Sequence, residues 1–243
     1  MTSNAELLKI AQKHLGQGGA LFRKYCGLPS GAAWCNAFVD YIANEGGVKS
    51  LYFNGAKETY CPHSMAWCKK NLAMIPLYLA MPMDIIYFDW DKNGNPNHIG
   101  FVRGRKDTSS IYTIEGNTDG GKVAQKTRPS KYVCGIFRPH FKPKSIKNAK
   151  LNVDGIFGYN SIGGLQKALG GLSVDGVMGL NTVKKLQQVC GCSQDGQWGK
   201  STSLACQRML IKAGFLAKGQ DDGAFGPNSV KALQKWINAK VYP

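Results

Sequence analysis

The motif Asp-Gly-x-x-Gly occurs four times in the C-terminal part of the chain and constrains the fold more than any other sequence feature. The copies span residues 154–158, 175–179, 195–199 and 222–226. Asp-Gly favours a tight turn, the fourth position is apolar in every copy, and the Asn, Ser or Thr that follow favour a helix start. Units of about twenty residues cannot bury an apolar face alone and must stack on one another. The sequence therefore predicts a small all-α repeat domain over residues 148–243.

The N-terminal part begins with helical patterns and continues with strand patterns. Ser3 and Glu6 form a capping box ahead of an apolar stripe. A further helix is expected to begin near Cys35, and another over residues 64–72. Short strand patterns separated by turns follow over residues 84–88, 98–103, 111–117, 122–127 and 132–138. Helices followed by consecutive strands predict an α+β fold with an antiparallel sheet over residues 1–142.

A segment rich in proline and lysine separates the two parts. Pro139, Pro143 and several lysines lie between residues 138 and 150. This composition is typical of a linker. The sequence therefore predicts one domain over residues 1–142, a linker over 143–147 and the repeat domain over 148–243.

Cys35 is expected in the first turn of a helix that carries Phe38, Val39 and Ile42 on one face. The unpaired backbone N–H groups and the positive end of the helix dipole favour a thiolate there. A free thiol has a pKa of about 8.5, and such a site lowers it to roughly 3.5–7.5. Cys35 is therefore a candidate nucleophile. The alternative is a small buried side chain that only packs in the core.

A cysteine nucleophile needs a histidine to move the proton and a polar group to orient the imidazole ring. His98 lies at the start of the strand pattern Asn-His-Ile-Gly-Phe-Val, and the next strand pattern carries Glu115 and Asn117 on one face. If these strands pair as antiparallel neighbours, Glu115 reaches the ring of His98. The sequence leaves open whether Glu115 or Asn117 orients the histidine.

The order of these motifs resembles the CHAP domain, a cysteine- and histidine-dependent amidohydrolase or peptidase of the papain-like, NlpC-type superfamily. The resemblance covers roughly residues 1–142, through Trp-Cys at a helix start, Asn-His-Ile-Gly-Phe-Val and Glu-Gly-Asn. It implies a papain-like fold with Cys35 as nucleophile and His98 as base. It also implies orienting or oxyanion-side roles for Glu115 and Asn117. The sequence departs from the family at Met83, where glycine is usual before an Asp-aliphatic strand.

The C-terminal motifs are similar to the peptidoglycan-binding repeats of cell-wall hydrolases, and the copy from Asp222 to Asn228 matches best. Together the two resemblances imply a phage or prophage endolysin that hydrolyses an amide bond of peptidoglycan. That bond is either N-acetylmuramoyl–L-alanine or one within the peptide stem or cross-bridge. The alternatives are a bacterial autolysin of the same chemistry and a wall-binding protein without catalysis. We expect the motif aspartates to shape the turns, and a ligand groove to use residues between the repeats.

The chain is basic, with a formal net charge of +16 at pH 7. Such a surface suits a polyanion, either anionic wall polymers or nucleic acid, and the resemblance implies peptidoglycan as the main partner. Nucleic acid is the poorer candidate, because the sequence has no helix-turn-helix, zinc-finger or RNA-binding signature. The oligomeric state is left open.

We expect no cofactor and no metal site. Two groups of side chains lack the paired spacing of a zinc site: Cys61, His63 and Cys68, and Cys190 with Cys192. Some phage CHAP domains bind calcium through acidic residues before the nucleophile, and residues 26–34 contain none. The eight cysteines are expected to be reduced thiols. His14 and His140 have no evident partner and are expected at the surface.

No apolar run approaches the ~20 residues of a membrane helix, and the first residues lack the pattern of a secretory signal. We therefore expect no stable membrane insertion. We also expect synthesis in the host bacterial cytoplasm, with action on the cell wall after release by another factor such as a phage holin.

Overall fold

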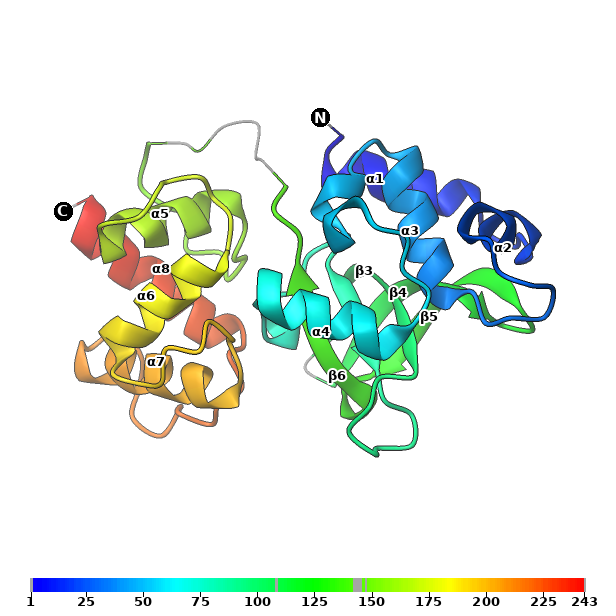
Figure 1. Ribbon diagram of the computed structural model, residues 1–243. Coiled ribbons are helices and arrows are strands. Elements are labelled where there is room, and N and C mark those ends of the chain that lie inside the picture. The colour runs from blue at the N-terminus through cyan, green and yellow to red at the C-terminus, as the bar shows by residue number, and fades with distance from the viewer. Residues whose placement is uncertain (1, 108, 142–145, 147, 243) are drawn as a thin grey trace. The chain divides into compact units, whose positions relative to one another are not determined.

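The computed structural model describes residues 2–107, 109–141, 146 and 148–242 (Figure 1). The chain divides into two compact units. The N-terminal unit comprises Met1–Asn71 and Ala80–Pro139, and the C-terminal unit comprises Leu72–Leu79 and His140–Pro243. The linker predicted over residues 143–147 lies outside the described residues except for Ile146.

The described part of the N-terminal unit contains four α-helices and three short 3₁₀ helices. The α-helices are α1 (Asn4–Lys13), α2 (Ala20–Cys26), α3 (Cys35–Glu45) and α4 (Cys61–Asn71). The 3₁₀ helices are Lys49–Leu51, Phe53–Gly55 and Ser130–Tyr132. The predicted capping box of Ser3 and Glu6 is confirmed at the start of α1. Helix α3 begins at Cys35 as predicted, whereas α4 begins three residues earlier than predicted, at Cys61.

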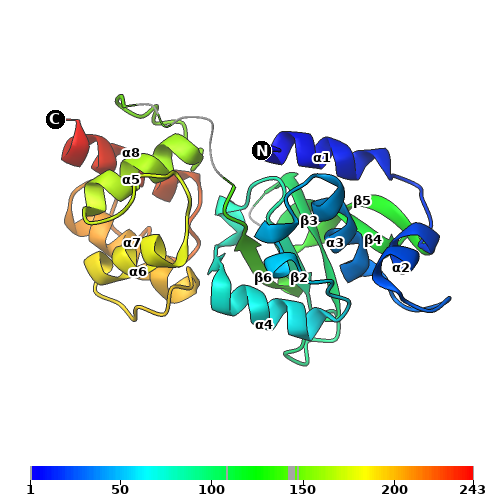
Figure 2. The ribbon, with the colours of Figure 1, turned by 45° about the horizontal axis from the view of Figure 1, so that its top comes forward.

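Five antiparallel strands of this unit form a sheet in the order β6-β2-β3-β4-β5. Their bounds are β2 (Ile85–Phe88), β3 (His98–Arg105), β4 (Ser110–Thr118), β5 (Lys122–Pro129) and β6 (Val133–Arg138). The α+β class and the antiparallel sheet are therefore confirmed. Helix α3 packs against β3 and β4, and the two views show it lying across that face of the sheet (Figures 1 and 2).

The core of the N-terminal unit lies between α3 and the sheet. Phe38 and Ile42 from α3 and Phe101 and Ile114 from the strands are fully buried. The rings of Phe38 and Phe101 meet edge to face with 6.0 Å between their centroids. Burial of one such side chain stabilises the fold by roughly 1.5–3 kcal/mol, so this contact fixes α3 on the sheet.

The backbone is strained two residues before β2. Met83 has a φ of 70°, a left-handed conformation that favours glycine. The next residue, Asp84, accepts hydrogen bonds from the backbone N–H of Met81 at 2.7 Å and from Nε and Nη2 of Arg138 at 3.0 and 2.9 Å. This buried ion pair joins the start of β2 to the end of β6. It holds the left-handed turn at Met83.

His14, expected at the surface without a partner, is partly buried and has two side-chain partners. Its Nδ1 lies 2.6 Å from Oε1 of Gln17, and its Nε2 lies 2.7 Å from Oε2 of Glu45. Its ring also packs edge-on against Tyr41. The contact with Gln17 is local in the chain. The contacts with Glu45 and Tyr41 depend on how α1 packs beside α3, which the sequence could not show. His140 is exposed, as predicted.

The C-terminal unit contains α5 (Tyr159–Leu169), α6 (Leu180–Cys190), α7 (Lys200–Lys212) and α8 (Pro227–Val241). The last glycine of each Asp-Gly-x-x-Gly motif is the N-cap residue of the helix that follows. The apolar residues at the fourth motif position are buried together in the core: Phe157, Met178, Trp198 and Phe225. The ring of Trp198 lies 6.1 Å from that of Phe157 and 5.1 Å from that of Phe225.

One glutamine of each helix holds the Asp-Gly turn of another motif. Its Nε2 donates to the aspartate and its Oε1 accepts from the glycine N–H, in the pairs Gln166 with Asp175 and Gly176, Gln187 with Asp195 and Gly196, Gln207 with Asp222 and Gly223, and Gln234 with Asp154 and Gly155. The last glutamine thus returns to the first motif, and the four units close on themselves. Each buried glutamine satisfies backbone groups that would otherwise be unpaired.

Each motif aspartate already accepts hydrogen bonds inside the C-terminal unit. Besides the glutamine, Oδ1 of each aspartate accepts the backbone N–H two residues later at 2.8 Å. This Asx-type turn fixes the backbone ahead of the helix. The geometry agrees with the expectation that these aspartates shape the turns.

The segment Leu72–Leu79 belongs to the C-terminal unit, which the sequence did not predict. It contains β1 (Ala73–Met74) and the 3₁₀ helix Leu77–Leu79. The carbonyl of Met74 accepts the N–H of Trp198 at 2.8 Å. A cut at the predicted linker would therefore separate this segment from its own unit. None of the helices in the described residues combines the length and apolarity needed to cross a membrane.

Candidate active site

Cys35 is the first residue of α3, and it is 6% exposed. Trp34, the N-cap residue, has no capping side-chain hydrogen bond, and its ring stacks on that of Phe22 at 4.9 Å. Gly116 of β4 lets this helix start approach the sheet, because a Cβ there would lie 2.4 Å from Cβ of Phe38. The local sequence thus brings the thiol close to the strands.

His98 and Glu115 come together where β3 and β4 lie side by side. Nε2 of His98 lies 2.8 Å from Oε2 of Glu115, and both side chains are buried. Gly100 on β3 leaves room for the carboxylate, because a Cβ at that position would lie 2.7 Å from Cγ of Glu115. Because Nε2 of His98 contacts Glu115, the other ring nitrogen, Nδ1, is available for the hydrogen bond with Cys35.

The charges of this cluster favour a thiolate and an imidazolium. A hydrogen bond with Cys61 and the adjacent His98 hold the pKa of Cys35 well below its usual range, against the effect of burial. Burial would lower the pKa of His98, but its hydrogen bonds with Cys35 and Glu115 outweigh burial and raise the pKa to about 9. Between these two pKa values the thiol has lost its proton and the ring carries one, which is the state that a cysteine nucleophile needs.

Arg128 on β5 holds Glu115, and the sequence had not indicated it. Its Nε donates to Oε1 of Glu115 at 2.8 Å, and its Nη2 donates to Oε2. Thr113 donates to the same carboxylate through Oγ1. Burial alone would raise the pKa of Glu115, but the bonds and charges of Arg128 and His98 lower it to about 2. The carboxylate is therefore ionised and fixed in position beside the ring.

Among the described contacts, none connects Asn117 with His98 or Glu115. Its φ is 56°, and the β4–β5 register shifts between Glu115 and Thr118. The irregularity breaks the strict alternation that placed Asn117 on the same face as Glu115. Glu115 is thus the candidate that contacts His98, and Asn117 is partly exposed near the end of β4.

Two stacked aromatic rings lie beside His98. The ring of Trp90 stacks on that of Phe88 at 4.7 Å and lies 5.9 Å from the ring of His98. The guanidinium of Arg128 lies 4.8 Å from the centre of the Trp90 ring. The backbone N–H of Trp90 donates to Oδ1 of Asn97 at 3.1 Å, which anchors the loop that carries the ring. Trp90 is partly exposed, so it shields the ion pair and also offers a surface to a substrate.

Cys61, the first residue of α4, is the second thiol at the site. Its Sγ lies 3.8 Å from Sγ of Cys35. The sequence had weighed Cys61 only as part of a metal cluster with His63 and Cys68. Within the described residues, no group of three or more His, Cys, Asp or Glu side chains is arranged to hold a metal ion.

The arrangement supplies the groups for acyl transfer: a thiolate at a helix start, an imidazolium beside it and a fixed carboxylate behind the ring. Three of the four candidate residues from the sequence meet here, namely Cys35, His98 and Glu115. Arg128, Trp90 and Cys61 were missed because their relevance depends on strand register and helix packing. No family model, curated protein or solved structure matches the chain.

Proposed function

We propose that the protein is a peptidoglycan hydrolase of the endolysin type. In this proposal the N-terminal unit is a papain-like CHAP domain that cleaves an amide bond, and the C-terminal unit is a repeat domain that holds the cell wall. The observation that supports it most is the contact of Cys35 with His98 and of His98 with Glu115. In this role the protein acts on the wall of its host after release from the cytoplasm.

The chemistry follows from the charges of the three residues. The thiolate of Cys35 attacks the amide carbonyl carbon, and the C=O electron pair moves to oxygen. The protonated His98 then gives its proton to the leaving amine, the C–N bond breaks, and a thioester remains. The neutral ring next takes a proton from water, whose oxygen attacks the thioester and expels the Cys35 thiolate. Glu115 orients the ring and stabilises the imidazolium in both steps.

The proposed substrate class is the amide bonds of peptidoglycan. The same steps cleave N-acetylmuramoyl–L-alanine or a bond in the peptide stem or cross-bridge, because both are amides. Mass spectrometry of the fragments released from purified wall distinguishes these two cases. An amidase frees intact peptide stems from the glycan, whereas an endopeptidase leaves peptides on the glycan in which the stem or the cross-bridge is cleaved.

A cavity between the first two repeats supports a wall-binding role for the C-terminal unit. It has a volume of about 940 Å³, and residues of the 171–182 segment line much of it together with His140. Ser173 and Asn181 line it and are exposed. Asp175 of the second motif also lines the cavity but is engaged in its turn, so the loop residues 171–174 and the start of α6 are the better candidates for contact with a wall fragment.

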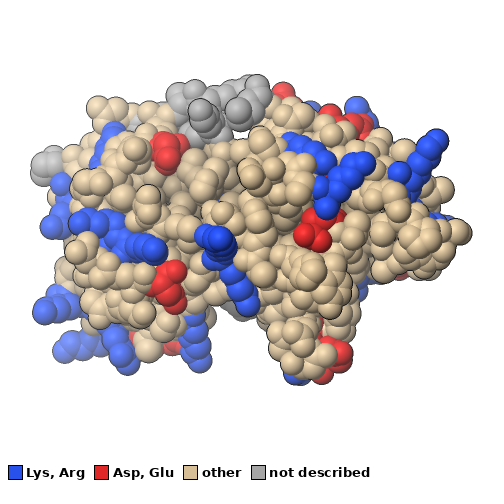
Figure 3. All heavy atoms as spheres, in the orientation of Figure 1, with Lys and Arg blue, Asp and Glu red and all other residues tan. Residues whose placement is uncertain are grey.

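Charge also supports this role. Lysines occur on all four helices and in the loops of the C-terminal unit, and exposed ones include Lys184, Lys200, Lys212, Lys218, Lys231 and Lys235. Figure 3 shows several basic side chains on the visible face of this unit. Exposed cations attract anionic wall polymers over about a Debye length, which is ~8 Å at physiological salt.

The test uses purified protein and Gram-positive cells. The wild type should lower the turbidity of the suspension, and Cys35→Ser should not, while still sedimenting with purified wall. Cys134→Ser is a matched control, since Cys134 is a partly buried thiol of the same unit that is not among the groups shifting the pKa of Cys35 or His98. Full lysis by Cys35→Ser would contradict the proposed mechanism. Sedimentation with wall but no fragment release by the wild type would favour a wall-binding protein without catalysis.

A second pair of variants tests the cavity in the Cys35→Ser background. Ser173→Trp fills the cavity and should weaken sedimentation with wall. Ser201→Trp places the same bulk on an exposed position of α7 outside the cavity and should not. Equal binding by both variants would show that the wall does not bind at this cavity.

A further inference from the structure

Two thiols face each other at the starts of two helices. Cys35 begins α3 and Cys61 begins α4, and their Sγ atoms lie 3.8 Å apart. Both residues are free thiols and each is 6% exposed. A small oxidant such as hydrogen peroxide reaches such a site more readily than a bulky thiol does. Hydrolysis needs only one of these sulfurs, so the second requires its own explanation.

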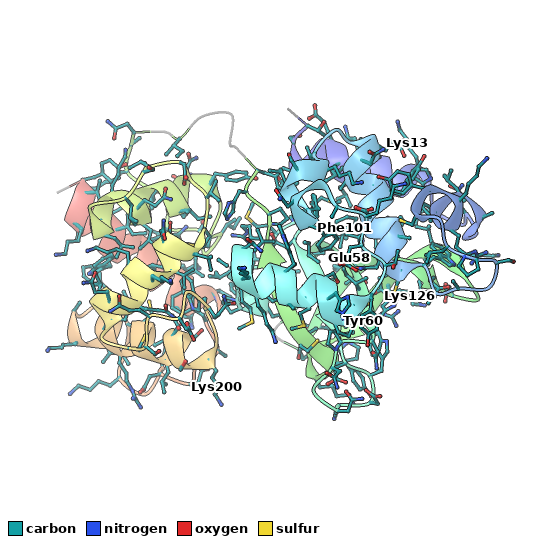
Figure 4. The ribbon with its side chains drawn as sticks, in the orientation of Figure 1. Lys13, Glu58, Tyr60, Phe101, Lys126 and Lys200 are labelled. Carbon is teal, nitrogen blue, oxygen red and sulfur yellow. The ribbon has the colours of Figure 1, made fainter. Side chains whose placement is uncertain are left out.

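The separation is short enough for a disulfide after a small movement. A disulfide bond is about 2.05 Å long, so the two sulfurs must approach by roughly 1.8 Å. Cys61 is the first residue of α4, and residues 56–60 before it lie outside helices and strands, so a small shift of Cys61 breaks no strand pairing. Figure 4 labels Tyr60 on this segment, at the end of α4 where Cys61 lies.

We propose that Cys61 is a resolving cysteine, which forms a reversible disulfide with Cys35 after a peroxide has oxidised the nucleophile. In the first step the Cys35 thiolate attacks one peroxide oxygen, the O–O bond breaks, and sulfenic acid and hydroxide form. In the second step the sulfur of Cys61 attacks the sulfenic sulfur. The S–O bond breaks, and the displaced hydroxide takes the thiol proton and leaves as water. A dithiol reverses the modification.

The electrostatics favour this order of events. The hydrogen bond with Cys35 is the largest cause that raises the pKa of the Cys61 thiol, and burial adds to it. Cys61 therefore keeps its proton while Cys35 is a thiolate. Once Cys35 is a sulfenic acid its negative charge is gone, and Cys61 loses its proton more easily. The same oxidation thus converts the neighbour into a nucleophile.

The other cysteines near these helices are not placed as well. Sγ of Cys26 lies 3.8 Å from Oδ2 of Asp40 on α3. Cys68 is fully buried and its Sγ lies 3.5 Å from the hydroxyl of Tyr87. Cys134 on β6 is partly buried, and no described hydrogen bond joins it to Cys35. The consequence of the proposal is protection, since a disulfide prevents irreversible oxidation of Cys35 to sulfinic or sulfonic acid.

The experiment treats the full-length protein with hydrogen peroxide and digests it under non-reducing conditions. Peptide mass spectrometry should find a linked Cys35–Cys61 peptide that dithiothreitol removes. Wall-hydrolysing activity should fall at least about tenfold and return to within about twofold of its starting value after dithiothreitol. The link is read by mass, so this test does not depend on the substrate proposed above.

Two variants make the test specific, each compared with its own activity before oxidation. Cys61→Ser should form no link, should accumulate sulfinic or sulfonic Cys35, and should not recover after dithiothreitol. Cys134→Ser should behave as the wild type does. The proposal is overturned if the wild type shows no Cys35–Cys61 peptide. It is also overturned if Cys61→Ser recovers as fully as the wild type, or if recovery depends on Cys134.

Discussion

His98 and Glu115, seventeen positions apart in the chain, are joined by a hydrogen bond of 2.8 Å between Nε2 and Oε2. The carboxylate cannot turn away, because Arg128 binds both of its oxygens. The ring is therefore oriented with its other nitrogen toward Cys35. In the proposed mechanism this contact makes His98 the proton carrier, and that role can be tested in several ways.

Removal of the proposed proton carrier should abolish most of the reaction. His98→Ala should lower kcat/KM for purified wall by about 10²–10⁴-fold, the usual contribution of general acid–base catalysis. Near-ultraviolet circular dichroism should remain unchanged if the fold is intact. Retention of most of the rate would show that another group carries the proton.

The pH profile should report the His98–Glu115 contact. The rate should rise with pH as Cys35 loses its proton, and fall as pH passes the His98 pKa of about 9. In Glu115→Gln the neutral amide no longer stabilises the imidazolium, so the upper limb should move to lower pH and the maximal rate should fall. Asn117→Gly, which suits the positive φ of that residue, should lose less rate and keep the upper limb in place. The opposite ranking would make Asn117 the orienting residue.

Acid should weaken the fold through Glu115. Its folded pKa of about 2 lies below its ordinary value of 4.5, so its contribution to stability is present above about pH 4.5 and is lost as pH falls through about 2. This lowering of the pKa corresponds to a contribution of roughly 3 kcal/mol to the free energy of unfolding. Urea unfolding between pH 5 and pH 2.5, compared between wild type and Glu115→Gln, measures it. An equal decline in both proteins would mean that Glu115 does not supply this dependence.

Loss of Arg128 should destabilise the fold, because the ionised Glu115 would lose its main hydrogen-bond donor. Arg128→Met leaves Glu115 buried with fewer donors, which should cost about 1–3 kcal/mol at pH 7. The pKa of Glu115 should rise, and the acid-dependent part of the stability should shrink. Lys131→Met, an exposed cation just after β5, is the control and should change little. Similar losses from both would indicate an effect of net charge alone.

The closure of the C-terminal unit should depend on Gln234. It holds the Asp-Gly turn of the first motif, eighty positions away, through Asp154 and Gly155. Gln234→Ala should lower the free energy of unfolding of this unit by about 1–3 kcal/mol, because the buried N–H of Gly155 loses its partner. Lys235→Ala, exposed on the same helix, is the control. Hydrogen exchange at residues 155–162 should rise only in Gln234→Ala, and unchanged exchange there would contradict the role of this contact.

The sequence by itself determined the features that depend on neighbours in the chain. The turn residues and the apolar stripe around Cys35 set the start of α3, and alternating patterns set the five strands. The repeated Asp-Gly turns set the helix starts of the C-terminal unit. The sequence also identified Cys35, His98 and Glu115 as candidate site residues, because two neighbouring strand patterns and one helix start carry those residue types.

The tertiary structure decided which distant side chains meet. It selected Glu115 rather than Asn117 through an irregularity in the β4–β5 pairing, and it brought Arg128 to that carboxylate. It placed Cys61 against Cys35 through the packing of two helices, and it returned Gln234 to Asp154. These contacts form between segments far apart in the chain. Their geometry depends on register and packing angles, which no local pattern of residues encodes.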